Sequence, residues 1–415
     1  MEIRKENKDL LIKYFENGSK RNCIEKLGVE LEHLIVRSET GESVTYQEEK
    51  GIAYILERLS EFFPWRYEPE GFLIGIYNED YSISLEPAGQ LEISINPREN
   101  ISLIYRIYRM FLEQIQPILR ECGYELLTLG YHPKSKVQDM PLIPKTRYEF
   151  MDRYFMETGT CGINMMRGTA ATQVSIDYCS EQDFVQKIRA AYILMPLLKL
   201  LTDNTPIMEG EIYEGYMARS YIWDHVDPAR TGIPKGLFDE DFGFDKYADF
   251  LLGMPPVFVE DQDTPMYTGH KSTAEVWGEE RLSRHDIEHV LSMNFQDVRL
   301  KHYLEIRYAD SMPIKCVLAY TALLKGIFYN KELVKEVNEK FSASEKEIIK
   351  AQKNLMKNGF DGDVYGYEAA KLLSYLIEAA KNQLMETEQL SLLPLEEILY
   401  HKRTLAREYY ENNIK

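Results

Sequence analysis

Five segments of the chain alternate polar and apolar residues with a period of two, a spacing that is typical of β-strands. Each segment has one apolar and one polar face, and in most of them the polar face carries a carboxylate. In the first, Glu30 and Glu32 lie opposite Val29 and Leu31. The five predicted strands span residues 29–34, 81–86, 90–96, 173–177 and 299–307.

Other segments have the apolar spacing of helices, residues 101–122 and 184–201 among them. After about Pro313 the pattern predicts helices throughout. Ser342 and Glu345 have the spacing of a capping box, and Gly359 is placed to end that helix before another over 367–384. No repeat or flexible linker divides the chain. We therefore predict one main domain over 1–312, with a helical C-terminal region, 313–415, packed on it.

The charge of the chain excludes some classes of partner. It has 415 residues and a formal net charge of −18, which repels polyanions, so we expect no nucleic acid as partner. Its longest apolar run, 190–201, is shorter than the roughly 20 residues that cross a bilayer. Residues 1–20 resemble neither a signal nor a transit peptide. We expect a cytoplasmic protein that does not bind membranes.

The cysteines are widely spread, and no two form a CxxC pair. This spacing predicts neither a disulfide framework nor a zinc site, so we expect reduced thiols. They are Cys23, Cys122, Cys161, Cys179 and Cys316.

The acidic strand faces predict a metal site. Each face taken alone could simply meet water, but short acidic side chains are unusual at exposed strand positions, and several strands share the habit. Gathered carboxylates repel one another unless cations neutralise them, and oxygen ligands suit Mg²⁺ or Mn²⁺. The predicted ligands are Glu30, Glu32, Glu86, Glu92, Glu305 and, through its amide oxygen, Gln173.

A group of cations shares the last polar face. Arg299, Lys301 and Arg307 lie beside Glu305, and together they provide the donors that phosphate oxygens need. The sequence has no GxxxxGK[ST] loop, and no GxGxxG motif follows a predicted strand. A nucleotide would therefore be held by side chains and metal ions on a sheet. His33 and His302 are expected to be packed residues rather than ligands.

Several motifs, taken in order, resemble those of the plant-type glutamate-cysteine ligases, a family also found in bacteria. The resemblance covers about residues 27–311. It rests on GVELE (28–32), SLEPAGQLEIS (84–94), PKTRY (144–148), MMR (165–167), the strand 172–177, ARSYIW (218–223) with 227–232, and VRLKHYLEIRYAD (298–310).

The resemblance implies an α+β fold like that of glutamine synthetase and the guanidino kinases. In that fold a curved, mainly antiparallel sheet holds the active site on its concave face, and helices lie outside. It also implies ATP-dependent joining of the γ-carboxyl of L-glutamate to the amine of L-cysteine through a γ-glutamyl phosphate. By resemblance Arg219 and Trp223 contact the glutamate, and Arg147 is a second contact to a substrate carboxylate. We assign the phosphate contacts to Arg299, Lys301 and Arg307.

Two departures from the family leave the amine acceptor open. Pro87-Ala88-Gly89 stands where the family usually has Gly-Gly, and a Met-Met-Phe-Arg motif is shortened to Met165-Met166-Arg167. The alternatives are a ligase of the same mechanism with another amine, a guanidino-type phosphotransferase, or a regulator that binds nucleotide or divalent ions without turnover. We expect a monomer or homodimer.

Overall fold

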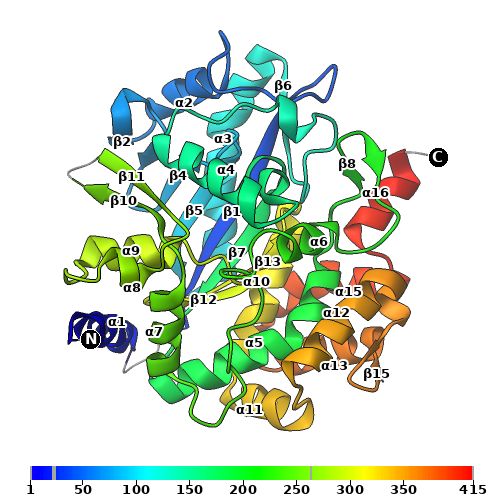
Figure 1. Ribbon diagram of the computed structural model, residues 1–415. Coiled ribbons are helices and arrows are strands. Elements are labelled where there is room, and N and C mark those ends of the chain that lie inside the picture. The colour runs from blue at the N-terminus through cyan, green and yellow to red at the C-terminus, as the bar shows by residue number, and fades with distance from the viewer. Residues whose placement is uncertain (1, 21–24, 262–263, 414–415) are drawn as a thin grey trace.

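The computed structural model describes residues 2–20, 25–261 and 264–413. Within these residues, the central sheet has nine strands in the order β12-β13-β7-β1-β5-β4-β3-β2, with β6 paired to β1. Figure 1 shows this sheet at the centre of the molecule, with helices around it. Every pairing within it is antiparallel, so the predicted mainly antiparallel sheet is confirmed. The strands are β1 (Leu27–Arg37), β2 (Trp65–Tyr67), β3 (Gly75–Tyr77), β4 (Tyr81–Leu85), β5 (Leu91–Arg98), β6 (Tyr124–Leu127), β7 (Ala171–Ile176), β12 (Val298–Leu300) and β13 (Leu304–Asp310).

The register of β1 brings polar side chains from different strands to one face. Glu32 pairs with Glu92 of β5, and Glu30 pairs with Gln173 of β7. Directly opposed residues in an antiparallel pair project from the same face with their Cβ atoms about 5 Å apart. Residues that are distant in sequence thus become neighbours.

The predicted single strand over 299–307 is wrong. The chain turns back at Lys301, His302 and Tyr303, and forms the hairpin of β12 and β13. The backbone N–H of Lys301 donates to the carbonyl of Tyr303 at 2.8 Å. Because Arg299 and Glu305 are paired across this hairpin, they still share a face.

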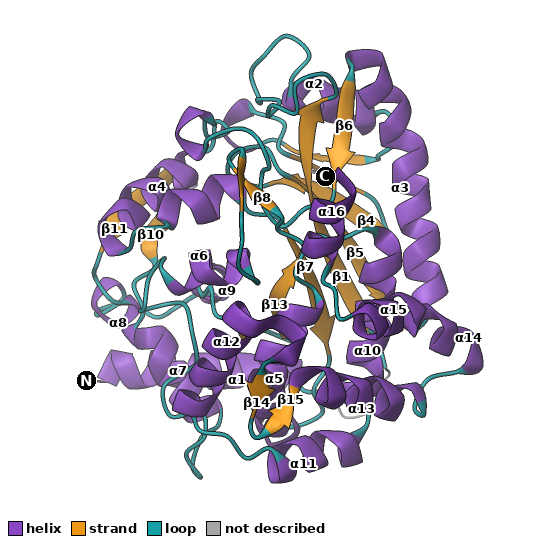
Figure 2. Ribbon diagram, turned by 90° about the vertical axis from the view of Figure 1, so that its right-hand side faces the viewer, coloured by secondary structure: helices purple, strands orange, loops and turns teal. Residues whose placement is uncertain are grey.

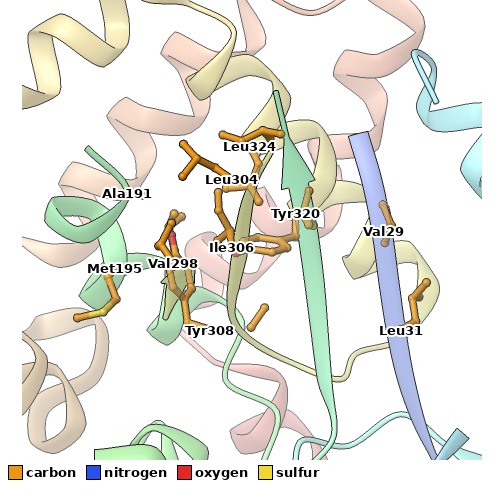
Figure 3. Packing of buried hydrophobic residues seen from close by; sticks show 14 of the residues in the cluster. Val29, Leu31, Ala191, Met195, Val298, Leu304, Ile306, Tyr308, Tyr320 and Leu324 are labelled. Carbon is orange, nitrogen blue, oxygen red and sulfur yellow. The ribbon is translucent and has the colours of Figure 1, made fainter. Parts of the chain in front are cut away.

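One face of the sheet packs on helices α3 (Ile101–Cys122) and α10 (Ile314–Phe328), and α5 (Glu181–Leu201) packs beside β13. Figure 3 shows Val29 and Leu31 of β1 and Ile306 of β13 in this core, near Tyr320 and Leu324 of α10. All five side chains are buried. The apolar half of the alternating pattern is therefore the half that packs on helices.

The other face of the sheet lies under shorter elements. Figure 2 shows α4 (Thr146–Thr158), α6 (Ala218–Asp224) and α9 (Arg284–Ser292) on the side of the sheet opposite α3. A single π-helical turn, η3 (Asn164–Gly168), precedes β7. The remaining elements before Pro313 are α1 (Glu2–Gly18), α2 (Ile52–Ser60), η1 (Pro69–Gly71), η2 (Val137–Asp139), β8 (Ile207–Met208), β9 (Glu211–Ile212), α7 (Phe244–Gly253), β10 (Val257–Asp261), β11 (Thr264–Gly269) and α8 (Thr273–Val276).

The C-terminal region is helical apart from one hairpin, which the sequence pattern missed. The capping box lies two residues later than predicted, between Ser344 and Glu347, while Gly359 ends that helix as expected. The elements are α10, α11 (Lys331–Lys340), α12 (Glu345–Asn358), η4 (Gly359–Asp361), β14 (Asp363–Val364), β15 (Tyr367–Glu368), α13 (Ala369–Lys381), α14 (Glu386–Gln389), η5 (Leu390–Leu392), α15 (Leu393–His401) and α16 (Leu405–Asn413). The division at residues 312 and 313 stays a prediction.

Two other expectations meet the structure here. Cys122, Cys161 and Cys316 are free thiols, but Cys179 takes part in a disulfide, so the expectation of a reduced thiol is wrong at that position. Sequence spacing alone did not reveal a pairing that depends on tertiary structure. Cys23 lies outside the described residues. None of the described helices is both long and apolar enough to cross a membrane.

The close contact between α10 and α13 gives a test of this packing. A Cβ atom on Gly326 would lie 2.6 Å from the carbonyl oxygen of Ala380. We predict that Gly326→Ala lowers the free energy of unfolding by about 1–3 kcal/mol, because the crowding exceeds the gain in helix propensity. Gly253→Ala is the matched control, since a Cβ there meets no atom within 4 Å. Denaturant titration measures both, and equal stabilities would contradict the packing described.

Candidate active site

A cavity of about 290 Å³ lies on the polar face of the sheet. The structure brings eleven of the twelve predicted site residues to its wall, although they come from nine separate elements or turns. The twelfth, Glu305, is buried and forms salt bridges with three of them. The eleven are Glu30, Glu32, Glu86, Glu92, Arg147, Gln173, Arg219, Trp223, Arg299, Lys301 and Arg307.

The carboxylates come from neighbouring strands and differ in their hydrogen bonding. Glu32 is fully engaged, since Oε1 accepts from Gln173 Nε2 at 3.0 Å and Oε2 accepts from the N–H of Ala171 at 2.8 Å. Glu92 Oε1 accepts from the hydroxyls of Ser84 and Ser94 at 3.1 and 3.0 Å. These bonds orient two of the four cavity carboxylates before any ligand binds.

The cavity carboxylates have too little neighbouring positive charge to offset the cost of their burial. Burial raises the pKa of Glu30 and of Glu92 to about 8, with a further contribution from nearby carboxylates. Burial and the charge of Glu32 raise the pKa of Glu86 to about 7. Burial also raises the pKa of Glu32. Removing a carboxylate from water disfavours its charged form, and like charges add to this effect. This side of the cavity therefore favours cations.

Glu305 is in the opposite situation. Its Oε2 accepts from Arg299 Nε at 2.5 Å and from Arg307 Nη1 at 3.0 Å, and its Oε1 accepts from Lys301 Nζ at 2.9 Å. Burial alone would raise the pKa of Glu305, but these three cations outweigh it and hold the pKa well below its usual range. Three positive charges surround one negative charge, so this end of the cavity attracts anions.

This arrangement bears on the predicted role of Glu305 as a metal ligand. The side chain is fully buried, and both of its oxygens are occupied by salt bridges. In this arrangement Glu305 orients the cations that line the cavity. Its role as a metal ligand stays a prediction, and it would require one of these contacts to open.

Three unpaired donors lie opposite the carboxylates. Arg147 is on α4, and Arg219 and Trp223 are four residues apart on α6, as their spacing predicted, with the Arg219 guanidinium 5.2 Å from the indole centroid. Arg147 Nε, Arg219 Nε and Trp223 Nε1 are buried and have no hydrogen-bond partner among the described residues. Buried donors are normally satisfied. Their N–H groups are therefore available to acceptor oxygens of a ligand.

Sequence analysis missed other residues of the cavity wall. Gln90 is buried, and its Nε2 donates to the carbonyls of Met166 and Thr169, both at 3.1 Å, which holds η3 against the sheet. Gln90 lies within the SLEPAGQLEIS motif, so the sequence already offered a reason to consider it as a site residue. Ser292 and Phe295, at the end of α9, had no motif to mark them. The missed residues are Pro87, Gln90, Tyr148, Met151, Met165, Met166, Thr169, Ser292 and Phe295.

Neither histidine singled out earlier lines the cavity. His33 is buried, with Nε2 2.9 Å from the Tyr108 hydroxyl and Nδ1 3.2 Å from the Leu91 carbonyl oxygen, as expected of a packed residue. Burial lowers its pKa to about 4. His302 is only partly buried at the β12–β13 turn, where its ring lies 3.9 Å from that of Tyr14.

The described oxygen ligands of the cavity do not form a complete metal site by themselves. Among the described residues, no three His, Cys, Asp or Glu side chains are gathered into a ready-made metal site. Mg²⁺ is usually held by one or two carboxylates together with substrate phosphates, rather than by a cage of protein ligands alone. Glu30, Glu86 and Glu92, with their raised pKa values, fit that kind of site. The residues therefore suit an ion that binds with a nucleotide.

Comparison with known proteins places this geometry in context. The model of glutamate-cysteine ligase family 2 matches residues 26–408. The chloroplastic glutamate–cysteine ligase of Arabidopsis thaliana is 32% identical over 351 residues, which are 82% of this chain and 67% of that protein. Chloroplastic glutamate–cysteine ligase B of Oryza sativa subsp. japonica is 33% identical over 341 residues, which are 80% of this chain and 68% of that protein.

A solved structure shares the fold. The crystal structure of a glutamate–cysteine ligase from Francisella tularensis in complex with AMP matches with a TM-score of 0.55. The match covers 96% of this chain and 86% of that one, at 10% sequence identity. At so low an identity the likeness shows the fold alone.

The raised pKa values predict how the stability of the metal-free protein depends on pH. An acid whose pKa is higher in the folded than in the unfolded state destabilises the fold as pH rises between the two values. Here the window runs from about 4.5 to about 8. We expect the free energy of unfolding to fall as pH rises through this window, from about 4.5 to about 8, and to change little above it on account of these carboxylates. Glu92→Gln should flatten this slope and raise stability at pH 8 by about 1 kcal/mol or more.

Chemical denaturation after chelation, at several pH values, provides the measurement. Glu288→Gln is the control, because Glu288 is partly exposed and forms only a surface ion pair with Arg284. If the pH dependence of the free energy of unfolding is the same in Glu92→Gln as in the unchanged protein, ionisation of the buried Glu92 does not destabilise the fold.

Proposed function

From the glutamate-cysteine ligase family 2, to which this chain belongs, we infer an ATP-dependent ligase that joins L-glutamate to L-cysteine. The family resemblance drawn from the motifs is thereby confirmed. The solved ligase with the same fold was crystallised with AMP, which supports the use of ATP here. The roles of single residues, the metal ion and the acyl phosphate given below are our proposals.

One observation carries the proposed division of roles, namely the separation of charge within the cavity. Carboxylates with raised pKa values occupy β1, β5 and the end of β4, while three cations cluster on Glu305 at β12 and β13. A metal–nucleotide complex has the same two parts, a cation and a polyanion. The cavity is complementary to such a complex.

Glutamate is proposed to bind at the unpaired donors. A guanidinium donates to both oxygens of a carboxylate, which gives strength and direction. Arg219, on α6, would hold the α-carboxylate of glutamate beside the ring of Trp223. Arg147 would hold the second substrate carboxylate from α4, where its Nε has no partner among the described residues.

Arg299, Lys301 and Arg307 are proposed to hold the phosphates. Glu305 fixes the three cations in place. Arg299 Nη1 also donates to the backbone carbonyl of Asn294 at 3.0 Å, and Arg307 Nη1 also donates to Gln173 Oε1. The phosphate chain would therefore be contacted by Nη2 of the two arginines and by Nζ of Lys301. Donors that are already oriented cost little reorganisation when charge develops during the reaction. This favours transfer of the γ-phosphoryl group.

A divalent ion fits the carboxylate side. Glu30, Glu86 and Glu92 would hold Mg²⁺ or Mn²⁺, with Glu32 and Gln173 adjacent. Bound there, the ion would supply charge neutralisation between the phosphates and the substrate carboxylate.

The proposed chemistry passes through an acyl phosphate. A carboxylate is a poor acyl donor, so an oxygen of the glutamate γ-carboxylate attacks the γ-phosphorus of ATP, and ADP leaves. The lone pair of the cysteine amine then attacks the acyl carbon, phosphate leaves with one former carboxylate oxygen, and the amine loses a proton. A cytoplasmic location and the monomer or homodimer state stay predictions.

Oxygen labelling tests this route. With ¹⁸O in the γ-carboxylate of glutamate, we predict that the released phosphate carries one labelled oxygen for each amide formed, as measured by mass spectrometry. Phosphate without label in a reaction that forms γ-glutamylcysteine would contradict the acyl-phosphate proposal. A stable phosphorylated product without amide would favour a phosphotransferase, and a different amide from an amine panel would change the acceptor.

A further inference from the structure

Helix α6, which carries Arg219 and Trp223, begins in an unusual way. Its first turn follows Met217, a residue other than glycine in the left-handed region, with φ of 60° and ψ of 46°. No side chain of the N-cap residue caps the helix. Such a backbone conformation persists only where surrounding contacts enforce it. The contacts around Met217 therefore decide where α6 begins.

A buried carboxylate provides the main contact. Asp203, in the turn after α5, accepts a hydrogen bond at Oδ1 from the backbone N–H of Met217 at 3.1 Å. Its Oδ2 accepts from the hydroxyl of Thr404 at 3.0 Å. Asp203 and Thr404 are both at least 98% buried. Neither lines the cavity.

The same turn also controls the charge behind Arg219. The backbone N–H of Asn204 and the hydroxyl of Thr205 donate to Oδ2 of Asp310 at 2.8 and 2.7 Å. Asp310 is buried. Burial lowers the pKa of Arg219, and the negative charge of Asp310 opposes this lowering more strongly than that of any other described carboxylate does. The turn thus contacts both the start of α6 and the carboxylate with the largest electrostatic effect on its arginine.

The C-terminal region contacts both the turn at Asp203 and the residues just before α6. The N–H of Ala406, at the start of α16, donates to the backbone carbonyl of Asp203 at 3.2 Å. Arg407 of α16 donates to the carbonyls of Glu214 and Gly215, just before Met217. The N–H of Tyr216 donates to the carbonyl of Met356 in α12 at 3.1 Å. Figure 1 shows α16, in red, beside β8 and near α6.

We propose that Asp203 is a positioning residue for substrate glutamate, which it places by fixing the start of α6, and that Thr404 of the C-terminal region holds Asp203 in place. The proposal rests on the proposed role of Arg219 in binding the substrate carboxylate. It gives the segment that leads into α16 a part in substrate binding, although no described residue of the C-terminal region lines the cavity.

The position of the contacts predicts which kinetic constant changes. Arg219 and Trp223 are on α6, whereas the proposed phosphate contacts are on β12 and β13, which Asp203 does not touch through any hydrogen bond between described residues. A shift of α6 should therefore raise the KM for glutamate and leave the KM for ATP nearly unchanged. A general loss of folding would lower the melting temperature and affect all substrates.

The test compares four variants of the full chain by steady-state kinetics and thermal unfolding. We expect Asp203→Ala to raise the KM for glutamate about tenfold or more, with the KM for ATP within about twofold. Asp203→Asn should restore most of the affinity, because its amide oxygen still accepts from Met217. Thr404→Val should raise the KM for glutamate by about threefold or more. Thr321→Val is the control, since its buried hydroxyl donates only to the carbonyl of Val317 in its own helix.

Several outcomes would overturn the proposal. Equal rises in the two KM values, an Asp203→Asn variant as defective as Asp203→Ala, or a Thr404→Val variant indistinguishable from Thr321→Val would each do so. If Asp203→Ala fails to fold, Asp203→Asn and Thr404→Val decide the question.

Arg219→Ala separates this proposal from the proposed function. If that variant keeps the affinity of the unchanged protein for glutamate, as measured by calorimetry without ATP, the assignment of Arg219 fails. If Arg219→Ala loses glutamate binding while Asp203→Ala and Thr404→Val keep it, only the positioning role fails.

Discussion

The burial of acidic side chains on one face of an antiparallel sheet is the constraint on which the rest of the site depends. The apolar face must pack on helices such as α3 and α10, and the period of two then sends Glu30, Glu32 and Glu92 into a covered cavity. Desolvation makes their charged forms costly, as the raised pKa values show. A protein that only needed a stable sheet would gain by replacing them. The proposed cation, bound together with the substrates, would account for their presence.

The cationic end of the cavity is the counterpart of this arrangement. Glu305 is the one carboxylate of the group whose pKa is lowered, because three cations surround it. It keeps Arg299, Lys301 and Arg307 together in a buried place where they would otherwise repel one another. We therefore expect the metal ion to neutralise the carboxylates and the phosphates to neutralise the three cations. The same charged groups would then serve both substrate binding and catalysis.

Much of this was predictable from sequence because alternation and motif order are local signals. The polar faces of four strands and the helix over 101–122 were identified in this way. The turn at His302 was missed, since every second residue from Arg299 to Arg307 stays polar through the hairpin and only His302 interrupts the apolar positions between them. Three contacts were not predictable, because only the fold brings their partners together. They are the hydrogen bonds of Glu305 with Arg299, of Gln90 with Met166 and of Asp203 with Met217. No pattern along the chain records those distances.

Manganese binding tests the central claim most directly. The protein is first freed of metal ions and of chelator. Electron paramagnetic resonance then measures the free Mn²⁺ in the presence of this protein, glutamate and a non-hydrolysable ATP analogue at pH 7.5. The account predicts Mn²⁺ bound to the unchanged protein, and binding weakened about tenfold or more when Glu30 and Glu92 are both replaced by Gln. Equal affinity in the double variant and the unchanged protein would contradict a metal site built on these carboxylates.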